Sequence, residues 1–512
     1  MEKDIMSTRQ LARRDFMKTT VALSILGPMA GSHSAEVKRD TKRKHPNLVV
    51  VFPDQMRGQA LGFLNEDPVV TPHLDRFAKE SLVLPQAVSN YPVCSPFRAM
   101  FMTGKYPHAN RVTSNCTSIT EPSGCELQKS DQCWSDVLKD RGYSLGYVGK
   151  WHLDSPRSPY IECKNNRADT KWNEWCDPER RHGFDYWYSY GTYDYHMNPM
   201  YWSTDAKREE FHFVKQWGPE HEADLAIDYI RNEEGKHRRS NQPFALVVSM
   251  NPPHTPYDQF PKKYLESYES KTSRDLLVRP NVDKSGKTRM SKLALSQTKN
   301  YFANVTGVDE QFGRILQGIN DAGLKEDTIV LFTSDHGNCV GTHNLATKNN
   351  PFEESMRIPF IICWPGKIKA RRDELLMSAP DIYPTLLELM GFKNFIPGSV
   401  QGTSHSEIFL TGKGVRPSSQ LYLKVPYDNT RSGLRGVRTH RYKLVMTAVL
   451  NKPLNSQLYN LELDPYEMSD IAESSPDIIK QLVKDELLPW LKRTNDPWIE
   501  NLQKTNKSID DS

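Results

Sequence analysis

The sequence has 512 residues, of which 37% are hydrophobic and 25% are charged. These values are typical of a globular protein, and they exclude a disordered chain and a chain embedded in a membrane. The formal net charge is +4, from 67 Lys and Arg against 63 Asp and Glu. Because positive and negative charges nearly balance, and the sequence has no arginine-rich run and no known nucleic-acid-binding motif, we expect no nucleic-acid partner.

The N-terminal segment has the three parts of an export signal. Arg13 and Arg14 precede a short apolar stretch at 21–29, and small residues follow it. The stretch is too short to span a bilayer, and the adjacent arginines resemble a bacterial twin-arginine signal. An uncleaved amphipathic start is the alternative. We therefore expect residues 1–35 to be an export signal that engages the twin-arginine machinery, and the protein to be periplasmic or secreted and not integral to a membrane.

Buried strands and amphipathic helices alternate through the middle of the chain. Continuous apolar runs, typical of strands that are covered on both faces, occur at 47–52, 244–250, 329–333 and 358–363. Over 305–319, apolar residues recur at spacings of three and four and predict a helix. This alternation predicts an α/β fold with a large, mostly parallel central sheet flanked by helices.

Towards the C-terminus the pattern changes. Segments 436–446 and 457–463 resemble short hairpin strands and precede a helix expected at 476–491. Polar stretches at 265–298 and 398–418 are expected to form surface loops or linkers. The predicted organisation is an export signal at 1–35, a main domain at 36–414 and a smaller C-terminal α+β subdomain at 415–512.

Cys94 is the first candidate for chemistry. Pro96 suits the first position of a helix, because its missing N–H is not needed there. Cys94 would then lie at the helix N-terminus, where free backbone N–H groups favour an anion, and Arg98 would lie on the same face. A buried or disulfide-bonded cysteine is the alternative for an isolated residue. Export would also permit disulfides within 116–133 and within 163–176.

Two segments resemble the signature motifs of the formylglycine-dependent sulfatases, members of the alkaline-phosphatase-like superfamily. The first is Cys94-Ser95-Pro96-Phe97-Arg98, followed after four residues by Thr103-Gly104. The second is the segment 142–152, Gly-Tyr-Ser-Leu-Gly-Tyr-Val-Gly-Lys-Trp-His, in which Leu145 stands where the family usually has Ser or Thr. The resemblance implies a sulfuric-ester hydrolase with its catalytic domain at 36–414. It also implies that a formylglycine-generating or sulfatase-maturating enzyme oxidises Cys94 to formylglycine.

Acidic residues follow two of the expected strands. Asp54 follows the first strand and Asp335 the third, and carboxylates at the carboxyl ends of parallel strands converge where α/β proteins bind ligands. Such groups suit a hard divalent cation, although an Asp after a strand is often only a turn residue. The resemblance implies calcium, with Mn²⁺ or Mg²⁺ as alternatives, and it includes Cys94 in the ligand set. Gln55 and His336 complete that set, although many members have Asp and Asn at these two positions.

Four further basic residues match positions that the family uses: Lys150, His152, His254 and Lys348. Taken alone, each of them would be interpreted as a solvated surface charge or as a histidine whose ring nitrogens are hydrogen-bonded within the protein. In the implied mechanism, an oxygen of the hydrated formylglycine attacks sulfur while Arg98 and the metal stabilise negative charge. His254 or Lys348 protonates the leaving alcohol. His152 then deprotonates the second hydroxyl, which expels sulfate, and Lys150 orients the formylglycine.

Eight aromatic residues gather within 186–202. In a loop-like insertion they would stack on sugar rings at the rim of a cleft, or they would pack on one another. Together with export, this pattern favours a sulfated polysaccharide or its oligosaccharides over a small aryl sulfate as substrate. The rival functions are a phosphodiesterase or phosphonate monoester hydrolase of the same superfamily, and an inactive glycan-binding relative.

Overall fold

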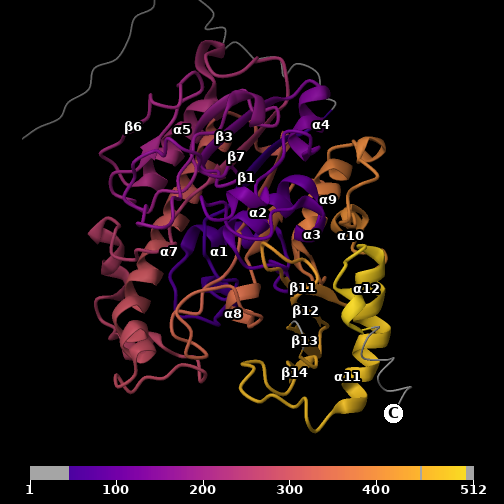
Figure 1. Ribbon diagram of the computed structural model, residues 1–512. Coiled ribbons are helices and arrows are strands. Elements are labelled where there is room, and N and C mark those ends of the chain that lie inside the picture. The colour runs from indigo at the N-terminus through magenta and orange to yellow at the C-terminus, as the bar shows by residue number, and fades with distance from the viewer. Residues whose placement is uncertain (1–44, 450–451, 503–512) are drawn as a thin grey trace, which may run out of the picture. The chain divides into compact units, whose positions relative to one another are not determined.

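The computed structural model describes residues 45–449 and 452–502 (Figure 1). The expected export signal at 1–35 lies outside these residues, as do the start of the predicted main domain and the end of the C-terminal subdomain. The signal and the domain boundaries therefore stay predictions. Within the described ranges, every helix is too short or too polar to cross a lipid bilayer.

Eight strands form the main sheet, in the order β10-β2-β9-β8-β1-β7-β3-β4. The strands are β1 (Asn47–Val51), β2 (Leu82–Val83), β3 (Ser144–Lys150), β4 (Tyr186–Tyr190), β7 (Phe244–Ser249), β8 (Thr328–Thr333), β9 (Phe360–Cys363) and β10 (Arg371–Arg372). Neighbours run parallel except that β9 is antiparallel to both β2 and β8. The expected α/β fold with a large, mostly parallel sheet is confirmed, and all four expected strands are present.

Helices cover both faces of the main sheet. Val49 and Val51 of β1 share a hydrophobic cluster with α1, α5 and α7, whereas Leu48 and Val50 share one with α2, α4 and α9. All four side chains are fully buried, which explains why β1 is a continuous apolar run. The helices of this part are α1 (Pro72–Lys79), α2 (Cys94–Thr103), α3 (Pro107–Asn110), α4 (Trp134–Asp140), α5 (Gly218–Arg231), α6 (Ser273–Leu276), α7 (Arg289–Asp321), α8 (Glu353–Met356), α9 (Ile382–Leu389) and α10 (Ser406–Thr411).

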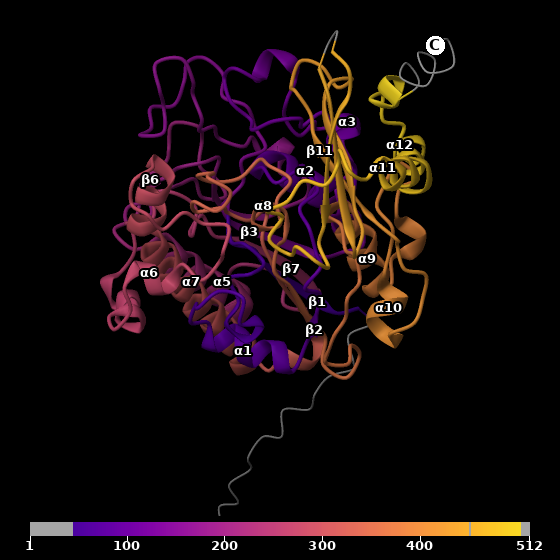
Figure 2. The ribbon, with the colours of Figure 1, turned by 90° about the horizontal axis from the view of Figure 1, so that it is seen from below.

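A second, antiparallel sheet follows in the C-terminal part. It consists of β11 (Gln420–Lys424), β12 (Gly433–Arg438), β13 (Tyr442–Ala448) and β14 (Asn455–Asn460), paired in that order. Helices α11 (Pro476–Leu482) and α12 (Leu488–Arg493) lie on one side of it, and α8 lies on the other (Figure 2). On the α8 side, Tyr422 and Val445 pack against Val88 and Met356. The smaller α+β region expected at the C-terminus is therefore present.

Two segments that were expected to be loops contain helices. The long helix α7 begins at Arg289, inside the stretch 265–298, and α10 lies inside 398–418. Thr288 caps α7, because its hydroxyl accepts a hydrogen bond from the backbone N–H of Ser291 at 3.1 Å. The expectation was wrong because the polar first turns of α7 carry no clear apolar stripe, and only its later turns showed the helical spacing.

Candidate functional site

The carboxyl ends of four neighbouring strands carry the predicted site residues. β8, β1, β7 and β3 lie side by side in the main sheet and run parallel. Asp335 follows β8, Asp54 follows β1 and His254 follows β7, while Lys150 is the last residue of β3. Since parallel strands end on the same edge of a sheet, residues far apart in sequence come together there.

Cys94 is the first residue of α2 and is 1% exposed. Pro96 is the third residue of the helix and not the first, as had been expected. It still lies in the first turn, where backbone N–H groups have no partner within the helix. The thiol Sγ of Cys94 is 3.1 Å from Lys348 Nζ and 3.4 Å from His336 Nε2. The start of α2 thus points Cys94 at residues contributed by β8 and the segment after it.

Arg98 joins the two predicted metal carboxylates. Its Nη2 donates to Asp54 Oδ2 and to Asp335 Oδ2, each at 3.2 Å. Its Nη1 donates to the carbonyl of Lys150 at 2.6 Å and to the hydroxyl of Ser249 at 2.7 Å. All these groups are buried, so the guanidinium fixes the two carboxylates relative to the ends of β3 and β7.

The two carboxylates differ in their pKa shifts. Burial opposes ionisation of Asp54, but the positive charge of Lys150, whose Nζ lies 2.7 Å from Asp54 Oδ2, holds the pKa of Asp54 well below its usual range. Burial raises the pKa of Asp335, and the adjacent negative charge of Asp54 raises it further. Two buried carboxylates of like charge at such short range are the arrangement that a bound cation stabilises.

The residues at this edge fit the expected divalent metal. Asp54, Cys94, Asp335 and His336 each offer one ligand atom, and these atoms lie within 4.8 Å of one another. His336 Nε2 is 3.5 Å from Asp54 Oδ1 and 3.6 Å from Asp335 Oδ1. Gln55 directs its amide Oε1 towards Lys348, whose Nζ donates to it at 3.1 Å. Carboxylate and amide oxygens are donors that a hard cation prefers.

Two lysines place positive charge beside Cys94. Lys150 Nζ lies 3.9 Å from Sγ of Cys94 and also donates to Asn251 Oδ1 at 3.1 Å. Lys348 is closer, as described above. Although burial and Asp54 oppose ionisation, Lys150, Lys348 and His336 hold the pKa of the Cys94 thiol well below its ordinary value. The site is therefore built to stabilise negative charge at position 94 and on a group bound beside it.

His152 is a neutral base candidate next to Cys94. Its Nε2 lies 3.3 Å from the carbonyl oxygen of Cys116 and donates to it when protonated, which leaves Nδ1 with a lone pair. The ring contacts the side chain of Cys94, and burial lowers the pKa of His152. A neutral imidazole with a free lone pair can accept a proton from a group at position 94.

His254 is held by a carboxylate that sequence analysis did not select. Its Nδ1 is 3.3 Å from Asp194 Oδ1 and 2.7 Å from the carbonyl oxygen of Thr255. Asn251 Nδ2 donates to the same carboxylate oxygen at 3.1 Å. Although burial and Lys348 oppose protonation, Asp194 raises the pKa of His254 to about 9. His254 is therefore an imidazolium at neutral pH, with Nδ1 engaged and Nε2 left for proton transfer.

All the predicted catalytic residues except His254 are linked to Cys94, Asp54 or Asp335 by the contacts given above. The residues missed by sequence analysis are Asn251, Asp194 and Ser249. Asn251 follows β7 almost as directly as Asp54 follows β1, so the same placement signal was present. Asp194 lies in an irregular segment between β4 and β5 (Met200–Tyr201), where no periodicity marks it.

The aromatic residues at 186–202 pack on one another and on rings of neighbouring segments. Trp187, Tyr201 and Trp202 are 2%, 0% and 1% exposed, respectively, and the last two belong to one hydrophobic cluster. Tyr201 also packs edge-on against the ring of Tyr190. The interpretation that the tryptophans stack on sugar rings is therefore wrong, because buried rings have no face to offer a ligand.

The candidate disulfides are not formed in the structure. All eight cysteines are free thiols. The thiols of Cys116 and Cys125 contact each other. Sγ of Cys163 instead bonds to Asn166 Oδ1 at 3.3 Å.

Comparisons with known proteins identify the family of this chain. Residues 46–392 match the family model described as Sulfatase, and residues 341–492 match that described as N-sulphoglucosamine sulphohydrolase, C-terminal. The chain is 40% identical over 490 residues to the Endo-4-O-sulfatase of Bacteroides thetaiotaomicron, covering 89% of this chain and 93% of that protein. It is 32% identical over 443 residues to the Ulvan-active sulfatase of Formosa agariphila, covering 85% and 78%. A Bacteroides fragilis crystal structure assigned as sulfatase yidJ superposes with a TM-score of 0.87 at 47% identity, covering 91% of this chain and 99% of the other.

Proposed function

This chain belongs to the sulfatase family, and we propose that it removes sulfate from a sulfated polysaccharide or from its oligosaccharides. The resemblance found in the two sequence motifs is confirmed, and the protein is a sulfatase. The names of the two relatives, an Endo-4-O-sulfatase and an Ulvan-active sulfatase, support a glycan as the substrate. The convergence of Cys94, Arg98 and two buried carboxylates at one sheet edge carries the proposal for this site.

We further propose that Cys94 is oxidised to formylglycine and that Asp54, Asp335, His336 and Gln55 hold calcium beside it. Formylglycine supplies a hydrated aldehyde with a nucleophilic oxygen, and calcium supplies electrophilic stabilisation of the sulfate oxygens. The carboxylate and amide oxygens favour a hard divalent cation, for which we propose calcium.

The surrounding side chains have separate roles in this proposal. Arg98 holds the metal carboxylates in place, and Lys150 orients the side chain at position 94. Lys348 places its ammonium group where the sulfate charge is stabilised. His254 holds a proton at Nε2 and gives it to the leaving alcohol oxygen, since Nδ1 is engaged elsewhere. His152 takes a proton at Nδ1 when sulfate is released.

We also propose that the protein is exported through the signal at residues 1–35 to the periplasm or the medium. A twin-arginine signal would export a folded chain, and Cys94 is 1% exposed in that chain. The maturating enzyme must then reach Cys94 in the cytoplasm, before the chain folds. Unfolded Cys94 within its motif is the substrate that this enzyme would recognise.

The proposed function is tested with matched sulfate and phosphate esters of one sugar. We expect the matured, calcium-loaded protein to release sulfate with a kcat/KM at least about a hundredfold above that for phosphate release. The measurement is the initial rate of inorganic sulfate or phosphate formation. Equal or higher kcat/KM for the phosphate ester would contradict the proposal and favour the phosphoesterase alternative.

Asp194→Asn tests the role of His254. Because Asp194 raises the pKa of His254 to about 9, removing its charge lowers that pKa, and His254 loses its proton at lower pH. We expect the alkaline limb of the pH profile of kcat/KM to move down by at least about one pH unit. The acidic limb should stay in place.

The matched control for this substitution is Asp205→Asn, which replaces an exposed aspartate shortly after β5. Its profile should overlay that of the wild type. An unchanged alkaline limb in Asp194→Asn, with activity retained, would show that His254 is not the group that protonates the leaving alcohol.

A further inference from the structure

A cavity of about 470 Å³ lies between the C-terminal sheet and segments next to Cys94. Its lining includes Tyr91, Ser114 and Asn349 on one side, and Lys424, Tyr427 and Thr447 on the other. We propose that it is a second sugar-binding subsite, which holds an anionic saccharide residue adjacent to the sulfated one. This inference rests on the proposed glycan sulfatase function and specifies its substrate.

The cavity adjoins the catalytic residues through short covalent and hydrogen-bonded links. Asn349 directly follows Lys348, whose Nζ is 3.1 Å from Cys94 Sγ, and the Asn349 N–H donates to the carbonyl of Pro92 at 3.2 Å. Ser114 precedes Asn115, whose Oδ1 accepts from the backbone N–H of Ser95 at 3.2 Å. A saccharide chain with its sulfate at Cys94 can therefore place its next residue in this cavity.

The strand register directs Lys424 towards the same space. Lys424 pairs with Leu434, and Leu434 pairs with Thr447, so the three lie in a row across β11, β12 and β13. Tyr422, two residues before Lys424, packs against Met356 of α8. Because side chains two apart on a strand share a face, Lys424 lies on the face that turns to the main part of the chain.

The polar groups of the cavity suit an anionic sugar. Lys424 is half-buried and forms no ion pair with any residue that the structure describes. Tyr427 is 43% exposed and offers an aromatic face for stacking on a sugar ring. A carboxylate or sulfate on the saccharide would pair with Lys424.

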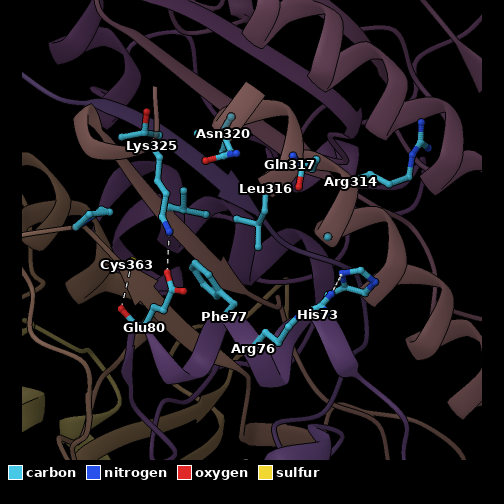
Figure 3. Close-up of a pocket in the computed structure, with 15 residues that line it drawn as sticks. His73, Arg76, Phe77, Glu80, Arg314, Leu316, Gln317, Asn320, Lys325 and Cys363 are labelled. Atoms are coloured by element: carbon cyan, nitrogen blue, oxygen red, sulfur yellow. Dashed lines mark hydrogen bonds and ion pairs between the residues drawn. The ribbon is translucent and has the colours of Figure 1, made fainter. Parts of the chain in front are cut away.

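A second cavity, of about 600 Å³, lacks these features. It lies between α1 and α7 at the amino end of β8, away from the edge that carries Cys94 (Figure 3). Two of its cationic groups form ion pairs: Lys325 Nζ lies 2.9 Å from Glu80 Oε2, and Arg314 pairs with Asp224. Lys325 therefore serves as a matched control for Lys424.

The test compares Lys424→Gln with Lys325→Gln in the matured, calcium-loaded enzyme. The substrates are a sulfated tetrasaccharide that contains uronic acids and a small aryl sulfate. We expect Lys424→Gln to lower kcat/KM for the tetrasaccharide about tenfold more than for the aryl sulfate, mainly through KM. Lys325→Gln should change both substrates equally. Tyr427→Ala should give the same substrate-selective loss as Lys424→Gln.

A carboxyl-reduced tetrasaccharide identifies the anion. If the effect of Lys424→Gln disappears with it, the bound group is a carboxylate; if the effect persists, the group is a second sulfate, and either result supports the subsite. Equal effects of Lys424→Gln on the tetrasaccharide and the aryl sulfate would overturn the subsite while leaving the proposed function intact. A wild-type enzyme that releases sulfate from neither substrate would overturn the proposed function and the subsite with it.

Discussion

Replacing Cys94 by alanine is expected to lower sulfate release by on the order of 10⁴-fold or more, because the side chain that supplies the nucleophile is removed. Cys94→Ser should behave in the same way as long as its hydroxyl is not oxidised. In the folded chain, two ammonium groups lie within 3.9 Å of Sγ, from Lys150 and Lys348. Their charge cannot compensate for a missing nucleophile. The measurement is kcat/KM for sulfate release, together with the intact mass of each variant.

The matched control is Cys363→Ala, which removes a buried thiol at the far end of β9. Sγ of Cys363 donates to the carbonyl of Glu80 at 3.4 Å. This variant should keep wild-type kcat/KM. The intact mass of active wild-type protein should correspond to an aldehyde at position 94. Full activity in protein that carries an unmodified thiol there, or in Cys94→Ala, would refute the proposed nucleophile.

Asp54→Asn is expected to remove calcium binding and to lower sulfate release by at least about a hundredfold. Asp54 offers one oxygen to the metal cluster and at the same time pairs with Lys150 at 2.7 Å and Arg98 at 3.2 Å. Without the negative charge of Asp54, the buried Lys150 and Arg98 are less well balanced. This change lowers the free energy of unfolding by about 3–5 kcal/mol. Calcium binding is measured by equilibrium dialysis, and stability by denaturant unfolding.

Asp496→Asn separates the loss of stability from the loss of the metal. Asp496 forms an equally buried pair with Arg435, 2.6 Å apart, in the C-terminal part. Breaking this pair should destabilise the protein to a similar extent while calcium binding stays at the wild-type level. If Asp54→Asn binds calcium as tightly as Asp496→Asn does, Asp54 is not a metal ligand.

Placement relative to strands made much of the site predictable. Asp54 and Asp335 each come shortly after a continuous apolar run, and the carboxyl ends of β1 and β8 are adjacent in the sheet. The same reasoning would have found Asn251 after β7, had amides been considered alongside carboxylates. Cys94 and Arg98 were predictable because the start of α2 places both on one helical face, a relation within a single turn.

Pairings between irregular segments were not predictable. The contact of Asp194 with His254 joins a loop after β4 to a loop after β7, and neither has a periodic pattern. The aromatic stretch was ambiguous for a related reason. The sequence shows that residues 187 and 202 are tryptophans. Whether Trp187 and Trp202 are buried depends on which segments pack over them.

The sequence by itself determined the α/β class, the position of the proposed nucleophile and the strands that surround it, because these follow from periodicity and from motifs within a few residues. Only the tertiary structure decided the antiparallel direction of β9, the carboxylate that holds His254 and the cavity that Lys424 lines. An apolar run has no direction, and a side chain that meets another from a distant segment leaves no local pattern. Such contacts arise from how whole elements pack. They raise the pKa of His254, and they form the cavity in which we propose that the neighbouring sugar binds.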